Sequence, residues 1–418
     1  MDVRRRALAS GLRVVVAPIA GLRSVAVLLA IEAGQWFEPP GRPGIARLVA
    51  QSMLRGTRSR DAKAWADALD ALGAAARLDV GSHAAVFSAQ SLGEDLGALL
   101  GLMAEAVVEP AFAETEVELV RAQTLAQIDE DARNTRAVAE RAWRELVYPI
   151  GHPFRARAIG QPDVVRSVTG ADIRRHHEEA IRPDGAILVV AGGIADDRAF
   201  AAADRAFAGW TRRAGRRQRD VMSVALAAAV RRLEVVPDKT QSDVIIGWPG
   251  LPRNDPRFVA ARVTNMVFAA DTFASRAGHV VRDELGLAYY VFSTIGASRG
   301  QSPWTVRMGV NPQNVERAVA VALEELRKIC DGKVAAEDLA LAQDKLVGEL
   351  DVVRESPGGV AGLVLEAEMF DLGPDHFERY PRELRAVTRD QVVTIARDFL
   401  PPDRHALAIA GPPLPEAA

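Results

Sequence analysis

Arg282 and Tyr289 are the two residues of this sequence whose types and spacing are best suited to chemistry. An arginine side chain offers five N–H donors in a fixed geometry, and a tyrosine side chain adds one hydroxyl donor. Such donors can hold the carbonyl groups of a peptide or the negative charge that develops on an oxygen in a transition state. A structural alternative stays open, in which Arg282 pairs with Asp283 or Glu284 and Tyr289 is a half-buried strand residue.

The segment around these two residues predicts a helix that turns into a strand. Gly286 stands where a left-handed residue would end the helix, and apolar residues at helical spacing precede it: Phe273, Ala277, Val280, Val281 and Leu285. Residues 289–295 are aromatic and β-branched, which is typical of a strand. Such a corner would let Arg282 and Tyr289 point into one space. Tyr290 would face the other way, because alternate residues of a strand lie on opposite faces.

The two halves of the sequence repeat one another at an offset of 219 residues. The repeated pairs are Val168-Thr169 with Val387-Thr388, Pro183-Asp184 with Pro402-Asp403, and Ala191-Gly192 with Ala410-Gly411. Proline and glycine at a constant offset indicate duplication of a domain of about 200 residues rather than a solenoid of short repeats. Each copy opens with strands, continues with helices and ends with a helix and a strand. We therefore predict the α+β class, with helices on one face of a mainly antiparallel sheet.

A charged segment separates the two copies. Residues 211–220 read TRRAGRRQRD and show no apolar periodicity, which is typical of a solvated connector. The predicted organisation is an N-terminal domain at 1–210, a linker at 211–230 and a C-terminal domain at 231–418. The C-terminal domain carries the Arg282 and Tyr289 pair.

Composition and charge narrow the classes of protein to consider. The 418 residues are 49% hydrophobic, and 52 basic against 55 acidic side chains leave a net charge of −3. This balance favours neither a nucleic acid nor a membrane as partner. A single cysteine, Cys330, excludes an internal disulfide and a cysteine-built metal site. No apolar run reaches the roughly 18 residues of a membrane span and no signal peptide is evident. We expect the cytoplasm, or the periplasm if a signal peptide has been removed.

One further cluster of side chains could bind a metal. His176 and Glu179 lie three residues apart on one face of a predicted helix, with His177 and Glu178 between them. Catalytic zinc takes three protein ligands and a water, and the sequence shows no third ligand. A solvated helix surface is the favoured interpretation. An independent hydrolase that uses His176 or His177 stays an alternative.

A series of short motifs runs along nearly the whole sequence, from Leu12 to Gly411. They are, in order, Gly34, Pro39-Pro40-Gly41, Gly44-Ile45-Ala46, Leu54-Arg55-Gly56-Thr57, Tyr148-Pro149, His152-Pro153, Gln241-Ser242 and the stretch from Arg282 to Tyr289. In this order they resemble the motifs of pitrilysin-type metallopeptidases, a family that includes the mitochondrial processing peptidases and the two-subunit bacterial zinc peptidases. The resemblance implies two similar α+β halves, as the repeat does, in a chain that forms half of a clam shell.

The zinc site of that family is degenerate in this sequence. Relatives with zinc carry the motif HxxEH, and the matching window here reads RLVAQ from Arg47 to Gln51. Arg47 and Gln51 replace the two histidines, Ala50 replaces the glutamate that activates water, and Gln127 replaces the third ligand. An arginine repels zinc, a glutamine is a poor ligand and an alanine accepts no proton. We therefore expect no metal in this chain and no peptide hydrolysis by the chain alone.

The resemblance assigns a role to Arg282 and Tyr289 instead. In the family, an arginine and a tyrosine seven positions apart help bind substrate and stabilise the transition state, and this pair matches them within VRDELGLAY. The resemblance implies the metal-free subunit of a heteromeric zinc peptidase, with both side chains supplied in trans to the zinc of an HxxEH-bearing partner of similar size. The substrate would be a peptide or a small unfolded protein in a shared chamber, and the isolated chain could form a homodimer. The alternative is a non-catalytic scaffold or assembly protein that retains the fold.

Overall fold

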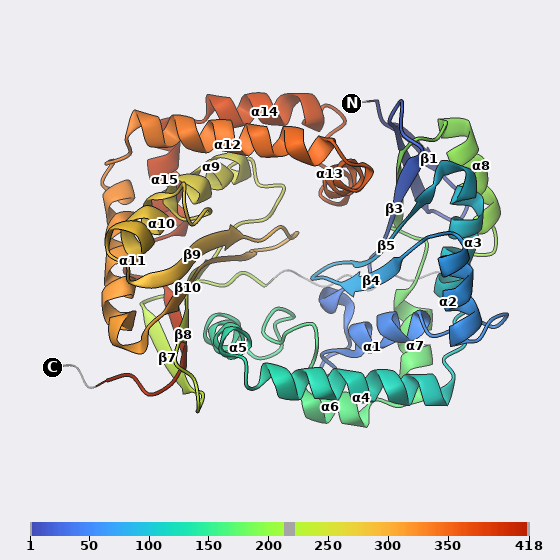
Figure 1. Ribbon diagram of the computed structural model, residues 1–418, viewed down its shortest axis with the longest axis horizontal. Helices are drawn as coiled ribbons and strands as arrows, with labels where there is room; N and C mark the ends of the chain where they lie inside the picture. Colours follow the sequence, from blue (N-terminus) through green and yellow to red (C-terminus); the bar gives the residue numbers. More distant parts are fainter. Residues whose placement is uncertain (1, 213–221, 416–418) are drawn as a thin grey trace. The chain divides into compact units, whose positions relative to one another are not determined.

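The computed structural model describes residues 2–212 and 222–415, which form two compact units (Figure 1). Each unit contains one β-sheet with its helices, so the predicted α+β class is confirmed. Each unit also draws on three separate stretches of the chain: the described parts of 1–128, 156–220 and 352–373 in the first unit, and of 129–155, 221–351 and 374–418 in the second. Residues 213–221 of the linker predicted at 211–230 lie outside the described residues.

The first unit has a six-stranded sheet in the order β1-β2-β6-β3-β5-β4. Its strands are β1 (Arg4–Ala7), β2 (Arg13–Pro18), β3 (Ser24–Ile31), β4 (Ala76–Val80), β5 (Ala85–Leu92) and β6 (Ile187–Gly192). Neighbouring strands are antiparallel except for the parallel pair of β2 and β6. The helices are α1 (Ile45–Met53), α2 (Ala62–Ala71), α3 (Leu96–Val108), α4 (Glu114–Asp131), α6 (Pro162–Ser167), α7 (Gly170–Ala180), α8 (Asp196–Ala206) and α13 (Pro357–Met369).

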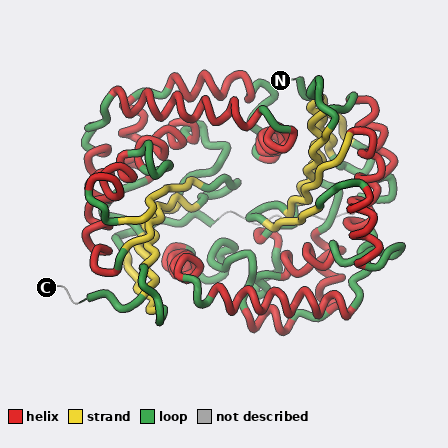
Figure 2. The backbone as a smooth tube through the Cα atoms, in the orientation of Figure 1, coloured by secondary structure: helices red, strands yellow, loops and turns green. Residues whose placement is uncertain are grey.

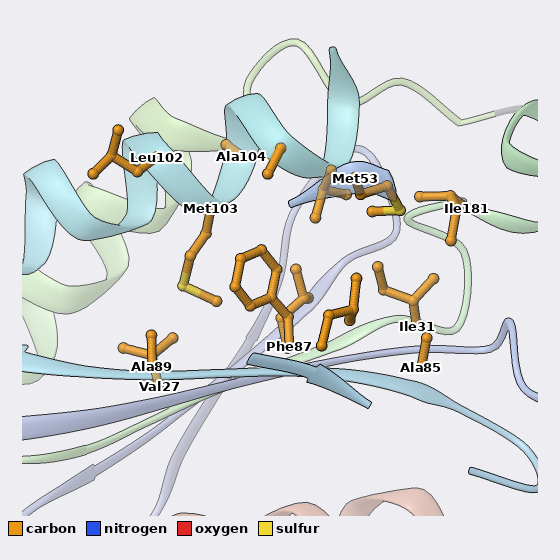
Figure 3. Packing of buried hydrophobic residues seen from close by; sticks show 14 of the residues in the cluster. Val27, Ile31, Met53, Ala85, Phe87, Ala89, Leu102, Met103, Ala104 and Ile181 are labelled. Carbon is orange, nitrogen blue, oxygen red and sulfur yellow. The ribbon is translucent and has the colours of Figure 1, made fainter. Parts of the chain in front are cut away.

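The main core of the first unit lies between this sheet and a layer of helices that includes α1 and α3. Val27 and Ile31 are four residues apart on β3 and therefore face the same side of the sheet. Figure 3 shows them with Phe87 of β5, beneath Met53 of α1 and Met103 of α3. All five side chains are fully buried. Their packing fixes α1, the helix that carries Arg47, Ala50 and Gln51, against the sheet.

The second unit has a five-stranded sheet in the order β7-β11-β8-β10-β9, seen as a separate group of strands in Figure 2. Its strands are β7 (Val230–Val235), β8 (Ser242–Pro249), β9 (Ala288–Ile295), β10 (Pro303–Val310) and β11 (Ala406–Gly411). Only β7 and β11 are parallel. The helices are α5 (Thr135–Val147), α9 (Phe258–Phe268), α10 (Arg276–Gly278), the π-helix η3 (His279–Glu284), α11 (Val315–Cys330), α12 (Ala336–Arg354), α14 (His376–Ala386) and α15 (Arg389–Phe399). None of the described helices combines the length and apolar character needed to cross a membrane.

The repeat in the sequence recurs in the structure. Strands β6 and β11 begin and end 219 residues apart, and each pairs in parallel with the first long strand of its unit and antiparallel with the next. Helices α7 and α15 start with the same capping box: Thr169 with Asp172 in α7, and Thr388 with Gln391 in α15. The two sheets are therefore built by the same order of elements.

Each sheet has a further helix on its second face, and that helix comes from the other half of the sequence. Alternation along β6 places Leu188 and Val190 in the main core and Ile187 and Val189 on the opposite face. Helix α13 packs there, against β2, β3 and β6, as Figure 1 shows. In the second unit, α5 packs in the same way against β7, β8 and β11. The sequence predicts helices on one face only, because helical periodicity does not reveal which sheet an amphipathic helix covers.

The capping box of α7 leads to a prediction about acid stability. The Asp172 carboxylate accepts hydrogen bonds from the Thr169 backbone N–H (3.0 Å) and hydroxyl (2.8 Å) and pairs with Arg42 (3.0 Å). These contacts, with the Thr169 backbone N–H foremost, lower the pKa of Asp172 from 3.8 to about 2. Because the folded-state pKa lies below the unfolded one, the ionised carboxylate stabilises the fold above about pH 4, and this contribution disappears as the pH falls toward about 2.

We expect Asp172→Gln, which copies the residue at the equivalent position of α15, to lower the free energy of unfolding by roughly 1 to 2 kcal/mol near neutral pH. The difference from wild type should vanish near pH 2. Urea unfolding of both proteins across this pH range measures it. Gln391→Ala is the matched control, because it disturbs a capping box with no ionisable partner. A destabilisation by Asp172→Gln that is equal at neutral and acid pH would contradict the prediction.

Candidate functional site

The corner that carries Arg282 and Tyr289 lies in the second unit. Helix α10 continues into the π-helix η3, and Ala277 of α10 and Val281 of η3 are fully buried in the core. Gly286 follows with a φ of +60°, a conformation that glycine adopts without strain, and β9 then begins. The predicted turn from helix to strand is confirmed. The π-type hydrogen bonding was not predicted, and short π-helical segments are frequent at functional sites.

The guanidinium of Arg282 is held by three contacts. Its Nε donates a hydrogen bond to the backbone carbonyl of Tyr289 (3.2 Å), and its Nη1 donates to Asp283 Oδ1 (2.8 Å). Its Cζ lies 4.5 Å from the centroid of the Phe273 ring, within the range of a cation–π contact. The two residues singled out from the sequence are therefore neighbours. The pairing with Asp283 that the structural alternative requires is present as well.

Unused hydrogen-bond donors remain at this corner. The Nη2 group of Arg282 makes no hydrogen bond or ion pair with any described residue, and neither does the Tyr289 hydroxyl. The Tyr289 side chain is 81% exposed, although a half-buried strand residue is the structural expectation for it. A fixed guanidinium with one open edge, beside an exposed phenol, can donate to a carbonyl oxygen or an oxyanion.

Acidic side chains and one histidine surround the same helix end. His279 lies 3.2 Å from Glu284 through Nε2 and 3.8 Å from Asp283 through Nδ1. All three side chains are solvent-exposed to a large degree. Asp283 therefore faces both His279 and Arg282, which limits the positive potential at the corner.

Tyr290 faces away from Tyr289, as strand alternation predicts. Its hydroxyl donates to Asp243 Oδ1, and the guanidinium of Arg136 lies 4.6 Å from the centroid of its ring. Thr135 donates to the other oxygen of the same carboxylate. Burial, reinforced by the Asp243 carboxylate, raises the pKa of Tyr290, so it stays a neutral donor. This network joins β9 and β8 to the start of α5. The sequence contains no signal for it, because Asp243 lies 47 residues from Tyr290 and 108 residues from Thr135.

The window from Arg47 to Gln51, which the resemblance matches to HxxEH, lies on α1 in the first unit. Ala50 is buried, and the Gln51 amide donates to the backbone carbonyl of Leu78 on β4 (2.9 Å). The Nε of Arg47 is buried and makes no hydrogen bond in the described part of the chain. Gln127, the fourth position, is exposed on α4.

The side chains at these positions do not fit a zinc ion. The Arg47 guanidinium is cationic, the Gln51 amide is already bound to backbone, and the Ala50 methyl group offers no ligand atom. Nowhere among the described residues do three or more His, Cys, Asp or Glu side chains gather as a metal site would require. These four positions therefore offer no set of zinc ligands.

The histidines of α7 have structural surroundings. His176 is buried, so the solvated surface that the sequence favours is wrong for this residue. His177 Nε2 lies 2.8 Å from the backbone carbonyl of Val107, and its ring meets the Phe112 ring edge-on at 5.2 Å. His177 therefore serves the packing of α7 against the end of α3, and His176 is enclosed in the fold, which gives no support to an independent hydrolase site.

Comparison with known families identifies the fold. Residues 13–153 match the family described as Insulinase (Peptidase family M16), and residues 167–346 match the Peptidase M16 inactive domain. The chain belongs to the M16 peptidase family. This is the pitrilysin and insulinase family, so the resemblance seen in the sequence is confirmed. The M16 inactive-domain match contains both Arg282 and Tyr289, and the other match contains Arg47, Ala50, Gln51 and Gln127.

M16 relatives cover almost the entire chain. An uncharacterized zinc protease of Streptomyces coelicolor is 26% identical over 98% of this chain and 90% of its own length. The uncharacterized zinc protease YmxG of Bacillus subtilis is 21% identical over 98% of both chains. Among solved structures, a peptidase M16 inactive domain from Pseudomonas fluorescens superposes with a TM-score of 0.92 at 21% identity over the full length of both chains. A protease from Helicobacter pylori gives 0.91 at 17% identity, covering 98% of this chain and 99% of its own. These structures share the fold.

Proposed function

We propose that this M16 chain is the metal-free subunit of a heteromeric zinc peptidase. The observation that carries the proposal is a combination within one chain. The zinc motif retains no ligand at Arg47, Ala50, Gln51 or Gln127, while Arg282 keeps open donors beside an exposed Tyr289. M16 family members often form dimers. The partner would be a chain of similar size that carries HxxEH and brings the zinc.

The role of this chain is to hold the substrate. The open Nη2 edge of Arg282 and the Tyr289 hydroxyl donate hydrogen bonds to a peptide carbonyl, and more strongly to the oxyanion that replaces it in the transition state. The Tyr289 carbonyl and the Phe273 ring fix the guanidinium before substrate arrives. The guanidinium therefore loses little further freedom when substrate binds. Donors that are already in place in this way can stabilise the transition state effectively.

A non-catalytic scaffold is the second candidate function. The observation that favours it is the 2.8 Å pair between Arg282 and Asp283, which neutralises the guanidinium without any substrate. In such a protein the fold would serve assembly, and the pair of Arg282 and Tyr289 would be a remnant. The two candidates differ in whether the complex cleaves peptides.

Purification of the tagged chain from its native source, followed by identification of the chains that accompany it, tests the proposal. We expect an HxxEH-bearing chain of similar size, stoichiometric zinc in the complex, and peptidase activity that neither chain shows alone. A stable complex with no peptidase activity on unfolded protein or peptide mixtures would favour the scaffold. Stoichiometric zinc in this chain by itself would contradict both candidates.

A further inference from the structure

Phe273 is an apolar side chain on the surface directly beside Arg282. It is 71% exposed, and one of its ring faces lies 4.5 Å from the Cζ of Arg282. The helical spacing in the sequence places Phe273 on a buried face, together with Ala277 and Val281. The structure buries those two residues and leaves Phe273 in solvent.

The loop that carries Phe273 is tied down at several points. Asp271 Oδ1 accepts hydrogen bonds from the backbone N–H groups of Phe273 (2.7 Å) and Ala274 (2.9 Å). The other carboxylate oxygen of Asp271 pairs with Lys345 of α12, and the Thr272 hydroxyl donates to the Val291 carbonyl of β9 (2.8 Å). The exposed ring is therefore presented by an ordered loop.

Two other exposed residues with apolar groups follow Arg282 closely in the chain. Tyr289 and Leu285, both exposed, belong to the same short segment around Arg282. Single apolar residues on a surface are common, whereas a group of them around a polar anchor is typical of a binding site. Because the loop is already ordered, binding does not have to offset the loss of its conformational entropy. If Phe273 only supported Arg282, contact with one face of its ring would be enough. The side chain is instead largely exposed to solvent.

We infer that Phe273 is a specificity-determining residue, which contacts an apolar, preferably aromatic, side chain of the bound peptide. The inference rests on the proposed function, because it places the peptide at Arg282 and Tyr289. While these two residues donate to backbone or transition-state oxygens and carry no information about sequence, Phe273 selects one side chain next to them. The substrate class is thereby narrowed to peptides with an apolar residue close to the cleaved bond.

The test uses the complex purified from the native source and fluorogenic peptides in which each position near the cleaved bond is in turn Phe, Leu, Ala or Ser. At one position, wild type should prefer Phe over Ser, and Phe273→Ala should reduce this ratio of kcat/KM values roughly tenfold. Phe273→Tyr should retain the preference. Leu341→Ala, which removes another exposed apolar side chain of the second unit, should leave every ratio unchanged.

Each other outcome overturns the inference in a recognisable way. An equal loss for all peptides in Phe273→Ala would mean that the ring only positions Arg282. Unchanged ratios in that variant, or a wild-type complex with no apolar preference at any position, would overturn the inference and leave the proposed function standing. A wild-type complex that cleaves no peptide would overturn both.

Discussion

Replacing Arg282 by alanine is expected to lower the kcat/KM of the zinc-containing complex by about 10²- to 10³-fold without preventing its assembly. The reason is the position of the charge: the guanidinium is anchored through Nε to the Tyr289 carbonyl and has an open Nη2 edge. Donors of this kind act mainly on the oxyanion of the transition state, so kcat should fall more than KM rises. Steady-state kinetics on one peptide, with gel filtration to confirm assembly, measures the effect.

Arg257 provides a matched control within the same unit. It pairs with a nearby carboxylate, Asp255 (2.8 Å), and its Cζ lies 4.7 Å from the ring centroid of Phe399, so it makes the same two kinds of contact as Arg282. Arg257→Ala should keep full activity. Arg282→Lys should remain strongly impaired, because an ammonium group lacks the planar set of donors. Equal activity of Arg282→Ala and wild type would contradict the proposal that Arg282 acts in trans at the zinc site of the partner.

Tyr289→Phe is expected to give a smaller loss, about tenfold or more, because it deletes one donor and keeps the ring. The side chain is 81% exposed and makes no hydrogen bond with the described residues, so the fold should not change. Tyr290→Phe is the informative comparison, since that hydroxyl belongs to the Asp243 network. Tyr290→Phe should lower the free energy of unfolding and should not weaken the stabilisation of the transition state.

Local patterns predicted the corner because all its determinants are close in sequence. A glycine at the end of an apolar helical pattern and a β-branched run after it fix where η3 ends and β9 begins. Local periodicity failed at Phe273 for an equally local reason. The Asp271 carboxylate binds the backbone N–H groups of Phe273 and Ala274, which holds this stretch in a turn, so the helix begins only at Arg276.

Long-range packing was not predictable from one sequence. The repeat at an offset of 219 anticipates that β6 and β11 are equivalent, because both strands keep the same glycine at the same end. It does not reveal that α13 packs on the first sheet and α5 on the second. The apolar residues of each helix specify only that one face is buried. For the same reason, no sequence motif predicts that Asp243 contacts Thr135 and Arg136.

The packing of α5 on the second sheet leads to the largest expected effect on stability. Trp143 is a fully buried residue of α5, and a Cβ placed at Gly247 of β8 would lie only 2.7 Å from its ring. The indole of Trp143 can therefore pack here only because Gly247 has no side chain. The Tyr148 ring meets Trp143 edge-on, with 6.0 Å between centroids. Trp143→Ala should lower the free energy of unfolding of the second unit by about 3 to 5 kcal/mol.

Hydrogen exchange followed by mass spectrometry is the suitable measurement, because a chain with two compact units need not unfold in one step. Protection should fall along β8 and β11, which contact α5, and stay unchanged along β3 and β6, which contact α13 instead. Arg141→Ala, an exposed position on the same helix, is the control and should change the free energy of unfolding by no more than about 0.5 kcal/mol. Unchanged protection of β8 and β11 in Trp143→Ala would show that α5 is not needed to hold the second sheet. An equal loss in β3 and β6 would show instead that the chain unfolds as a single cooperative unit, with stability shared across both sheets.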